Sequence, residues 1–332
     1  MAAWTELAGL PTAPLAGGLI NDTFAVGAPP VAVVQRLHPI FAPRLHHDVE
    51  AITSWIAARG LLTPRILRTA DGALWTLDDE QRCWRALTWV PGRTVERLED
   101  PKLARQAGAL VGRWHAATRD LEHEFAFVRP GAHDTDAHLA RLAEAVAAHP
   151  THPLRDAVEP LAVELFARWE AWQGRLDGPA RICHGDLKIS NLRFDEAGTG
   201  LCLLDLDTMA NLPLDIEMGD AMRSWCNPRG EDVSEAEFVS ELFEAAMTGW
   251  RGALNVSAED AQALVPGIER ICLELASRFA ADALNESYFG WDPSRFSSRG
   301  AHNLLRARGQ LALARSVSRQ RAELEACLSA AR

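Results

Sequence analysis

The stretch that most constrains the fold of this chain covers residues 181–209, with the sequence RICHGDLKISNLRFDEAGTGLCLLDLDTM. Two short apolar runs, Ile182–Cys183 and Leu201–Leu204, predict β-strands on either side of a polar loop. Polar side chains lie in this loop and at the end of the second run, and they are His184, Asp186, Asn191 and Asp205. The spacing H-x-D-x-x-x-x-N, followed by a strand that ends in Asp, predicts a functional site.

This spacing is the arrangement that phosphoryl transfer needs. Asp186 would accept the proton of an attacking hydroxyl, while Asn191 and Asp205 would hold Mg²⁺, which prefers hard oxygen ligands. Lys188, two residues after Asp186, would neutralise charge on the transferred phosphoryl group. The alternative is a β-hairpin whose polar turn contains these residues by chance, and the combined spacing of the groups argues against it.

The segments HGDLKISNLRF and LLDLDT resemble the catalytic motifs of small-molecule kinases such as aminoglycoside phosphotransferases, choline kinases and homoserine kinases. GGLINDTFAV and VVQRLHPIF near the start, with ESYFGW and HNLLRARGQ near the end, resemble the N-acetylhexosamine 1-kinase branch. The resemblance extends from about Pro14 to about Val317. It implies an α+β, bilobal, protein-kinase-like fold, with a small β-rich N-terminal lobe that carries one main helix and a larger, mainly helical C-terminal lobe.

The same resemblance implies an enzyme that uses ATP and Mg²⁺ and transfers the γ-phosphate to a sugar hydroxyl, in particular the anomeric hydroxyl of a hexose or N-acetylhexosamine. The superfamily equally allows an aminoglycoside, choline, ethanolamine or homoserine as the acceptor. A nucleotide-binding pseudokinase without transfer chemistry is a further hypothesis, supported by the absence of lysine from residues 1–101. The presence of Asp186, Asn191 and Asp205 argues against it.

Composition restricts the partners and the compartment. The net charge of −11 argues against a nucleic acid or an anionic membrane as the main partner. Six cysteines occur without a CxxC pair or a Cys/His ligand spacing, so neither zinc nor a disulfide framework is indicated. Met1–Leu10 lacks the features of a signal peptide, and no uncharged apolar run reaches the length of a membrane span. We therefore expect a cytoplasmic protein with a small-molecule acceptor.

The predicted lobes cover residues 1–90, which would bind the nucleotide, and residues 91–332, which would hold the catalytic groups and the acceptor. Residues 1 to about 40 read as a short leader and a β-hairpin region. The backbone of Thr88, Trp89 and Val90 would meet the adenine edge as a hinge, although the following Pro-Gly pair suits any strand-ending turn. Apolar patterns predict strands at 31–37, 64–67, 73–77 and 83–90, and helices at 46–59, 100–115, 137–149, 154–176, 235–250, 258–289 and from 302 onward.

Paired glycines near the start are candidates for a phosphate-binding loop. Gly17 and Gly18 precede a polar turn and an apolar run, and glycine lets backbone N–H groups approach phosphate oxygens closely. A simple Gly-Gly turn between strands is the alternative. In the sugar kinases that this chain resembles, the matching Asn-Asp segment lies over the nucleotide, so Asn21 and Asp22 are further candidates.

The resemblance also requires a cation for the nucleotide phosphates, and the predicted small lobe contains no lysine. Arg36, at the end of the predicted strand 31–37, is the first candidate for this role, and Gln35 is the second. Glu50 on the predicted helix 46–59 would pair with this cation, as in the kinases resembled. The alternatives are a strand-end arginine and a helix-face glutamate that both lie in solvent.

Several polar side chains after the catalytic motif are candidates for the acceptor pocket. Asp207, two residues after Asp205, would lie on the same strand face and bind a second metal or the substrate. In the family resembled, a similar Asp…Gly-Asp…Arg run helps build this pocket, which implicates Asp215, Asp220 and Arg223. A structural role is equally open for the two carboxylates, and Asp220 is placed to hold the catalytic loop.

Two more candidates lie near the C-terminus. Tyr288, in the segment Ser-Tyr-Phe-Gly-Trp, suits a wall on which a sugar ring stacks, and a hydrophobic anchor between helices is the alternative. Arg306 begins a long predicted helix and would face the acceptor or the phosphate, although arginines are common on the surface of such helices.

Overall fold

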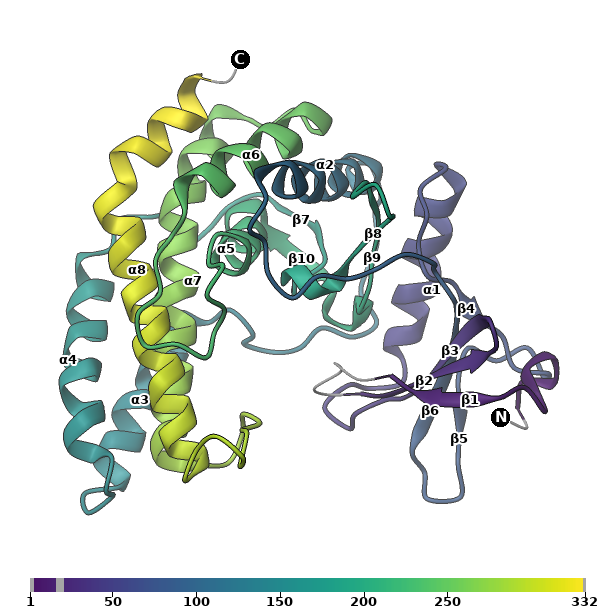
Figure 1. Cartoon of the computed structure of the whole chain (residues 1–332), viewed down its shortest axis with the longest axis horizontal. Coiled ribbons are helices and arrows are strands. Elements are labelled where there is room, and N and C mark those ends of the chain that lie inside the picture. The colour runs from purple at the N-terminus through teal and green to yellow at the C-terminus, as the bar shows by residue number, and fades with distance from the viewer. Residues whose placement is uncertain (1–2, 16–20, 331–332) are drawn as a thin grey trace.

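The computed structural model describes residues 3–15 and 21–330 of the chain, folded into two lobes joined by a single extended segment near residue 90 (Figure 1). In the described part of the small lobe the strands form one antiparallel sheet in the order β1-β2-β3-β6-β4, with β5 also paired to β6. Their bounds are β1 Thr12–Pro14, β2 Asp22–Gly27, β3 Pro30–Arg36, β4 Ile66–Leu67, β5 Thr76–Leu77 and β6 Cys83–Thr88. The predicted fold class is confirmed, while a boundary at residue 90 stays a prediction.

The main helix of the small lobe is α1, Leu45–Ala58, close to the predicted range of 46–59. Its apolar positions Val49, Ile52 and Ile56 are buried in the main core, as their helical spacing requires. The helix ends before Gly60, which adopts φ 77°, a conformation that glycine tolerates best.

The predicted leader is wrong, because the first described residues are part of the small lobe. Trp4 and Leu7 are buried with Val26 and Val34 in a second apolar cluster on the sheet. The indole N–H of Trp4 donates to the carbonyl oxygen of Leu67 at 2.8 Å, so this segment is fixed by a polar contact as well.

The large lobe is mainly helical, as expected. Helix α2 begins as the sequence predicts, because the Asp100 side chain accepts from the Lys102 N–H at 2.8 Å and proline occupies the first helical position. The helices are α2 Pro101–Thr118, α3 Thr135–Ala148, α4 Arg155–Ala171, α5 Leu214–Trp225, α6 Ser240–Ala253, α7 Ala258–Asn285 and α8 Arg299–Ala330. Helix α5 is absent from the predictions, and α7 ends before the predicted residue 289 because Glu286 turns into the left-handed region at φ 49°.

Both apolar runs around the catalytic motif are strands, but they do not pair with each other. Strand β7, Ala180–Cys183, pairs with β10, Ala210–Pro213, while β8, Leu192–Phe194, pairs with β9, Gly200–Leu203. The chain therefore forms two small antiparallel ribbons instead of one hairpin. The loop after β7 and the turn after β9 are consequently separate segments that polar contacts hold together.

The state of the cysteines and the hydropathy of the helices concern two further expectations. All six cysteines are free thiols, and five of them are buried. Within residues 3–15 and 21–330 we find no helix long and apolar enough to cross a bilayer. The cytoplasmic location stays a prediction.

Candidate active site

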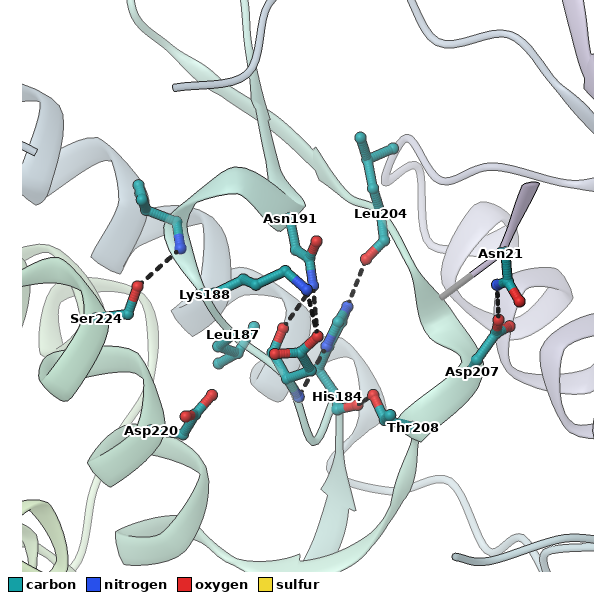
Figure 2. A network of polar contacts seen from close by, with 12 residues as sticks. Asn21, His184, Leu187, Lys188, Asn191, Leu204, Asp207, Thr208, Asp220 and Ser224 are labelled. Carbon is teal, nitrogen blue, oxygen red and sulfur yellow. Dashed lines mark hydrogen bonds and ion pairs between the residues drawn. The ribbon is translucent and has the colours of Figure 1, made fainter. Parts of the chain in front are cut away.

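The catalytic loop brings three of the predicted residues into direct contact (Figure 2). The Lys188 ammonium lies 2.9 Å from Oδ2 of Asp186. Asn191 donates through Nδ2 to the backbone oxygen of Asp186 at 2.8 Å and to its Oδ2 at 3.1 Å. Asp186 and Lys188 remain partly exposed, at 31% and 39% of their side chains, so an acceptor or a nucleotide can reach them.

The charges in this loop set the protonation states of Asp186 and Lys188. Burial alone would raise the pKa of the Asp186 carboxyl, but the positive charge and hydrogen bond of Lys188 hold it below its ordinary value. Burial likewise opposes the charge of Lys188, and the carboxylates of Asp186 and Asp205 hold the pKa of its ammonium above its ordinary value. Asp186 is therefore an ionised hydrogen-bond acceptor at neutral pH.

Glu217 on α5 is the residue that fixes the backbone of this loop. Its two carboxylate oxygens accept from the backbone N–H groups of His184 at 2.8 Å and Gly185 at 2.9 Å. His115 approaches Oε1 of Glu217 at 3.3 Å, and the Trp250 indole N–H donates to the other ring nitrogen of His115 at 3.0 Å. This arrangement places the imidazole proton toward Glu217, which is 1% exposed. Glu217, which no motif in the sequence singles out, thus has the loop-holding role expected of Asp220.

Other contacts join the catalytic loop to the turn after β9. The His184 ring donates through Nε2 to the carbonyl oxygen of Leu204 at 2.7 Å, and the Thr208 hydroxyl donates to the carbonyl oxygen of His184 at 2.9 Å (Figure 2). Gly185 adopts φ 78°, and a Cβ there would lie 2.3 Å from the Thr208 oxygen. Glycine is therefore required where the two segments touch.

Asp205 occupies this turn in a strained conformation. Its φ of 59° and ψ of 60° are left-handed values that non-glycine residues rarely adopt outside functional sites. Its side chain is exposed, yet desolvation by the surrounding protein and the negative charges of Asp207 and Asp186 raise its pKa to about 6. Asp205 is thus an acidic group in a region with excess negative charge.

Asn191 and Asp205 together fit a divalent cation. Nδ2 of Asn191 is engaged with Asp186, while its Oδ1 has no hydrogen bond to any residue the structure describes. The Asp205 carboxylate likewise has no partner among residues 3–15 and 21–330. One amide oxygen, one carboxylate and uncompensated negative charge are the features of a Mg²⁺ site that leaves room for water and phosphate ligands.

Asp207 does not share the environment of Asp205, which corrects the sequence prediction. The chain leaves β9 at Leu203 and turns, so the alternation of a strand no longer applies to these two residues. Arg85 of β6 forms a bidentate ion pair with the Asp207 carboxylate, and Asn21 donates to its Oδ2 at 2.8 Å (Figure 2). Asp207 is buried against the small lobe and not available to a second metal or a substrate.

Arg36 lies on the face of the sheet opposite to Asp207, so its predicted phosphate contact is not supported. It forms an ion pair with Asp22, its neighbour in the β2–β3 register. Gln35, one residue earlier, points the other way and accepts from Nε of Arg85 at 2.9 Å. Two corrections follow: Arg36 and Asp22 neutralise each other on the outer face, and Arg85 is the cation that points toward the large lobe.

The predicted partnership of Glu50 is also wrong. Its carboxylate lies 2.9 Å from Arg68 and 4.0 Å from Arg65, both in the small lobe. These pairs are partly exposed and contribute about 0–1 kcal/mol each. Glu50 therefore supports the surface of α1 and does not contact the cation that faces the site.

The hinge offers fewer free backbone groups than predicted. The N–H of Thr88 donates to the Arg65 oxygen at 2.8 Å, and that of Trp89 donates to the Val31 oxygen at 3.1 Å. The N–H of Val90 has no acceptor among the residues described, and its contact with a nucleotide base stays a prediction. Gly17 and Gly18 lie outside the described residues.

On the acceptor side, Asp220 has one free carboxylate oxygen. Its Oδ1 accepts from Arg223 at 3.0 Å, while its Oδ2 is buried and has no partner in the described part of the chain. Burial raises the pKa of Asp220, and the nearby negative charge of Asp186 raises it further. The positive charge of Arg223 opposes this shift without cancelling it. Arg223 also pairs with Glu231 at 2.7 Å. Asp220 and Arg223 thus lie beside the catalytic loop, and their part in the acceptor pocket stays a prediction.

Asp215 has a structural role. It is 2% exposed at the start of α5, where it accepts from Nη2 of Arg175 at 2.8 Å. Arg175 also pairs with Asp260 on α7 at 2.8 Å. Because this network joins α5 to the helix packed against it, the predicted substrate role of Asp215 is not supported.

The aromatic loop is held in place from its base. Asp282 accepts from the backbone N–H groups of Tyr288 at 2.9 Å and Phe289 at 2.8 Å, and Tyr288 is 49% exposed. Arg306 donates to the Gly290 oxygen at 2.7 Å and pairs with Asp232 at 2.8 Å. Arg306 therefore supports this loop and does not face the acceptor or the phosphate.

Comparison with known proteins gives the family. Residues 12–253 match the model of the phosphotransferase enzyme family, APH, and the chain belongs to that family. It is a phosphotransferase that acts on an alcohol group, as the catalytic motif predicts.

Solved structures share the fold at low sequence identity. An amicoumacin kinase in complex with AMP-PNP, Ca²⁺ and its ligand superposes with a TM-score of 0.63 at 15% identity, covering 91% of this chain and 87% of that one. A microcompartment-associated aminopropanol kinase gives 0.62 at 15%, covering 97% and 96%. A choline/ethanolamine kinase family protein from Mesorhizobium loti gives 0.60 at 16%, covering 98% and 96%.

Proposed function

We propose that this protein is an ATP- and Mg²⁺-dependent kinase that transfers the γ-phosphate to a sugar hydroxyl, in particular the anomeric hydroxyl of a hexose or N-acetylhexosamine. The observation that carries the proposal is the constellation of Asp186, Lys188 and Asn191 beside Asp205. Phosphoryl transfer requires positioning and charge stabilisation more than covalent chemistry, and these four groups supply both.

Each residue has a defined task in this proposal. Asp186 accepts a hydrogen bond from the acceptor hydroxyl and takes its proton, since Lys188 keeps the carboxylate ionised. Lys188 balances the charge that develops on the transferred group. Asn191 and Asp205 hold Mg²⁺, which when bound neutralises the phosphates. The free N–H of Val90 binds the edge of the base.

The choice of a sugar rests on the terminal motifs and the aromatic loop. The exposed Tyr288 ring, braced by Asp282 and packed edge-on against Phe289 at 4.8 Å, suits the apolar face of a pyranose. The motifs ESYFGW and HNLLRARGQ that resemble N-acetylhexosamine 1-kinases include this loop and the helix that supports it. Asp207, Asp215 and Arg306 take no part in acceptor binding in this proposal.

A second acceptor class is supported by Asp220. Its unpartnered buried oxygen beside Asp186 would suit an ammonium group, such as that of an aminoglycoside or an amino alcohol. Two proteins of similar fold are named as kinases of amine-bearing alcohols, one of aminopropanol and the other of choline or ethanolamine. The two candidates differ in whether the acceptor needs a positive charge.

A coupled ADP-release assay with ATP and Mg²⁺ separates these candidates. The acceptors are GlcNAc, GalNAc, glucose, galactose, kanamycin, choline and homoserine, and phosphorus NMR identifies the phosphorylated hydroxyl. Turnover of a reducing sugar that disappears when its anomeric hydroxyl is methylated supports the sugar 1-kinase. Turnover of amine-bearing acceptors alone supports the second class. No turnover of any of these alcohols would contradict both.

A further inference from the structure

We propose that Arg85 is a positioning residue that acts from the small lobe: it holds the turn that carries Asp205 and so sets the geometry of the metal site. Because this role concerns the metal of the proposed kinase, it rests on that proposed function. Arg85 thereby connects the two lobes at the site, while Arg36 lies on the other face of the sheet.

The contact between Arg85 and Asp207 has the geometry of a specific anchor. Arg85 is 2% exposed, and its two terminal nitrogens reach the two oxygens of Asp207, with Nη2 and Oδ2 2.9 Å apart. Its Nε donates to Gln35 at 2.9 Å, and Gln35 donates to Thr23 at 3.1 Å. A planar guanidinium held in this way by the sheet fixes both the position and the direction of the carboxylate.

Asp207 passes this constraint to Asp205 through a short rigid turn. Residues 206–208 form a single 3-10 turn, and Asp205 precedes it in the left-handed conformation. Such a conformation persists only where surrounding contacts maintain it. The turn is anchored at Asp207 by the small lobe and at Thr208 by the His184 oxygen, so the direction of Asp205 depends on both lobes.

Asn21, directly before β2, also binds Asp207. Its Nδ2 donates to Oδ2 of Asp207 at 2.8 Å (Figure 2), and its Oδ1 accepts from the His38 N–H at 2.9 Å. Asn21 directly follows the segment that contains Gly17 and Gly18 in the sequence. One carboxylate of the large lobe therefore holds both the sheet and the end of the predicted phosphate loop.

The same contacts exclude a direct phosphate contact by Arg85 in this arrangement. Three of its N–H groups are directed at Gln35 and Asp207, and its side chain is closed to solvent. A phosphate would have to displace Asp207 and leave that carboxylate buried without a counter-charge, which is unfavourable. Arg85 consequently acts through Asp207 and not on the nucleotide.

The test compares Arg85→Lys with Arg82→Lys, a control on a half-exposed arginine that pairs with Asp78 on the outer side of the small lobe. The dissociation constant of Mn²⁺ is measured in the presence of ADP by water-proton relaxation, which needs no turnover. Lysine keeps the positive charge but cannot form two parallel hydrogen bonds to the Asp207 carboxylate. We expect Mn²⁺ to bind Arg85→Lys about 10- to 100-fold more weakly and Arg82→Lys as the wild type, since such supporting contacts typically have this effect. Unchanged Mn²⁺ binding in folded Arg85→Lys would overturn the proposal.

If Arg85→Lys does not fold, two further measurements decide. The double variant Arg85→Gln/Asp207→Asn removes both buried charges together, and it should fold and bind Mn²⁺ more weakly, whereas unchanged binding overturns the proposal. In the wild type without nucleotide, hydrogen exchange of the Leu204 N–H, which donates to the Asn191 oxygen at 2.8 Å at the start of this turn, should be slow, and rapid exchange there overturns the proposal. Absence of Mn²⁺ binding in the wild type would instead refute the proposed metal site itself.

Discussion

The catalytic loop and the contact between the lobes hold their charged side chains in different ways. Asp186 and Lys188 lie two residues apart, and about a third of each side chain is exposed. Arg85 and Asp207 are 122 residues apart, come from different lobes, and are at most 2% exposed. The first pair can be altered without leaving a buried charge alone, and the second cannot. We therefore expect variants of the loop to lose activity and variants of the buried network to lose stability as well.

The largest expected effect is that of Asp186→Asn, which removes the base and keeps its shape. The turnover number should fall by about 10²- to 10⁴-fold, the usual contribution of a general base. Thermal stability and ATP binding, measured by calorimetry, should remain close to those of the wild type. Asp156→Asn on the exposed side of α4 is the matched control. Comparable turnover in the two variants would refute the role of Asp186.

Glu217→Gln tests the buried network beneath the same loop. The amide keeps one oxygen but loses the charge that accepts from His184 and Gly185 N–H groups, so the free energy of unfolding should fall by about 2 to 3 kcal/mol. Turnover should fall together with stability. Urea unfolding measures the change, and Glu241→Gln at the exposed start of α6 is the control. A stability equal to the control would show that the loop is held by other contacts.

A pH dependence follows from His46, which is fully buried in the small lobe near Arg85. Burial and then the positive charge of Arg85 lower the pKa of His46 from 6.5 to about 4. Because the folded state binds the proton less readily, stability is lost as the pH falls from about 6.5 toward 4. The contribution should be about 2 kcal/mol at pH 5 relative to pH 8.

His46→Gln isolates this contribution, because the variant has no imidazole to titrate. The difference in unfolding free energy between wild type and variant should narrow or reverse as the pH falls from 8 to 5. A difference that does not change with pH would mean that folding leaves the pKa of His46 unchanged. It would contradict the effect of burial and of the Arg85 charge on that pKa.

The smallest expected effect is that of Arg36→Ala, which sharpens the contrast with Arg85. Arg36 is 37% exposed and paired with Asp22, so its removal should change stability by about 0–1 kcal/mol. The KM for ATP should change far less than the Mn²⁺ affinity changes in Arg85→Lys. A larger rise in KM for ATP would restore the phosphate role that the sequence suggested for Arg36.

Spacing in the sequence predicts the catalytic loop because its contacts are local. Asp186, Lys188 and Asn191 meet within six residues, and the offset of Asn191 is itself the signal. Most helices are likewise evident from apolar periodicity and from caps such as Asp100, whereas the two-lobe fold was expected only from the resemblance to small-molecule kinases.

The cross-lobe contacts do not follow from spacing. The end of an apolar strand points to Arg36, yet a shift of one residue along a strand reverses the face, and Gln35 occupies the inner position. Glu217 has no signal in the sequence either, because the residues it binds lie 32 and 33 positions away. In β6, Arg85 interrupts a largely apolar run. This interruption is the sequence signal for a charged side chain that points toward the large lobe.

The most direct test of this account is a crystal structure of the wild type with AMP-PNP and Mg²⁺. We predict a metal ion bound by Oδ1 of Asn191 and the carboxylate of Asp205, with Arg85 still paired to Asp207 and the Val90 N–H on the base. A metal held by other residues, or Arg85 detached from Asp207 and bound to a phosphate, would contradict it.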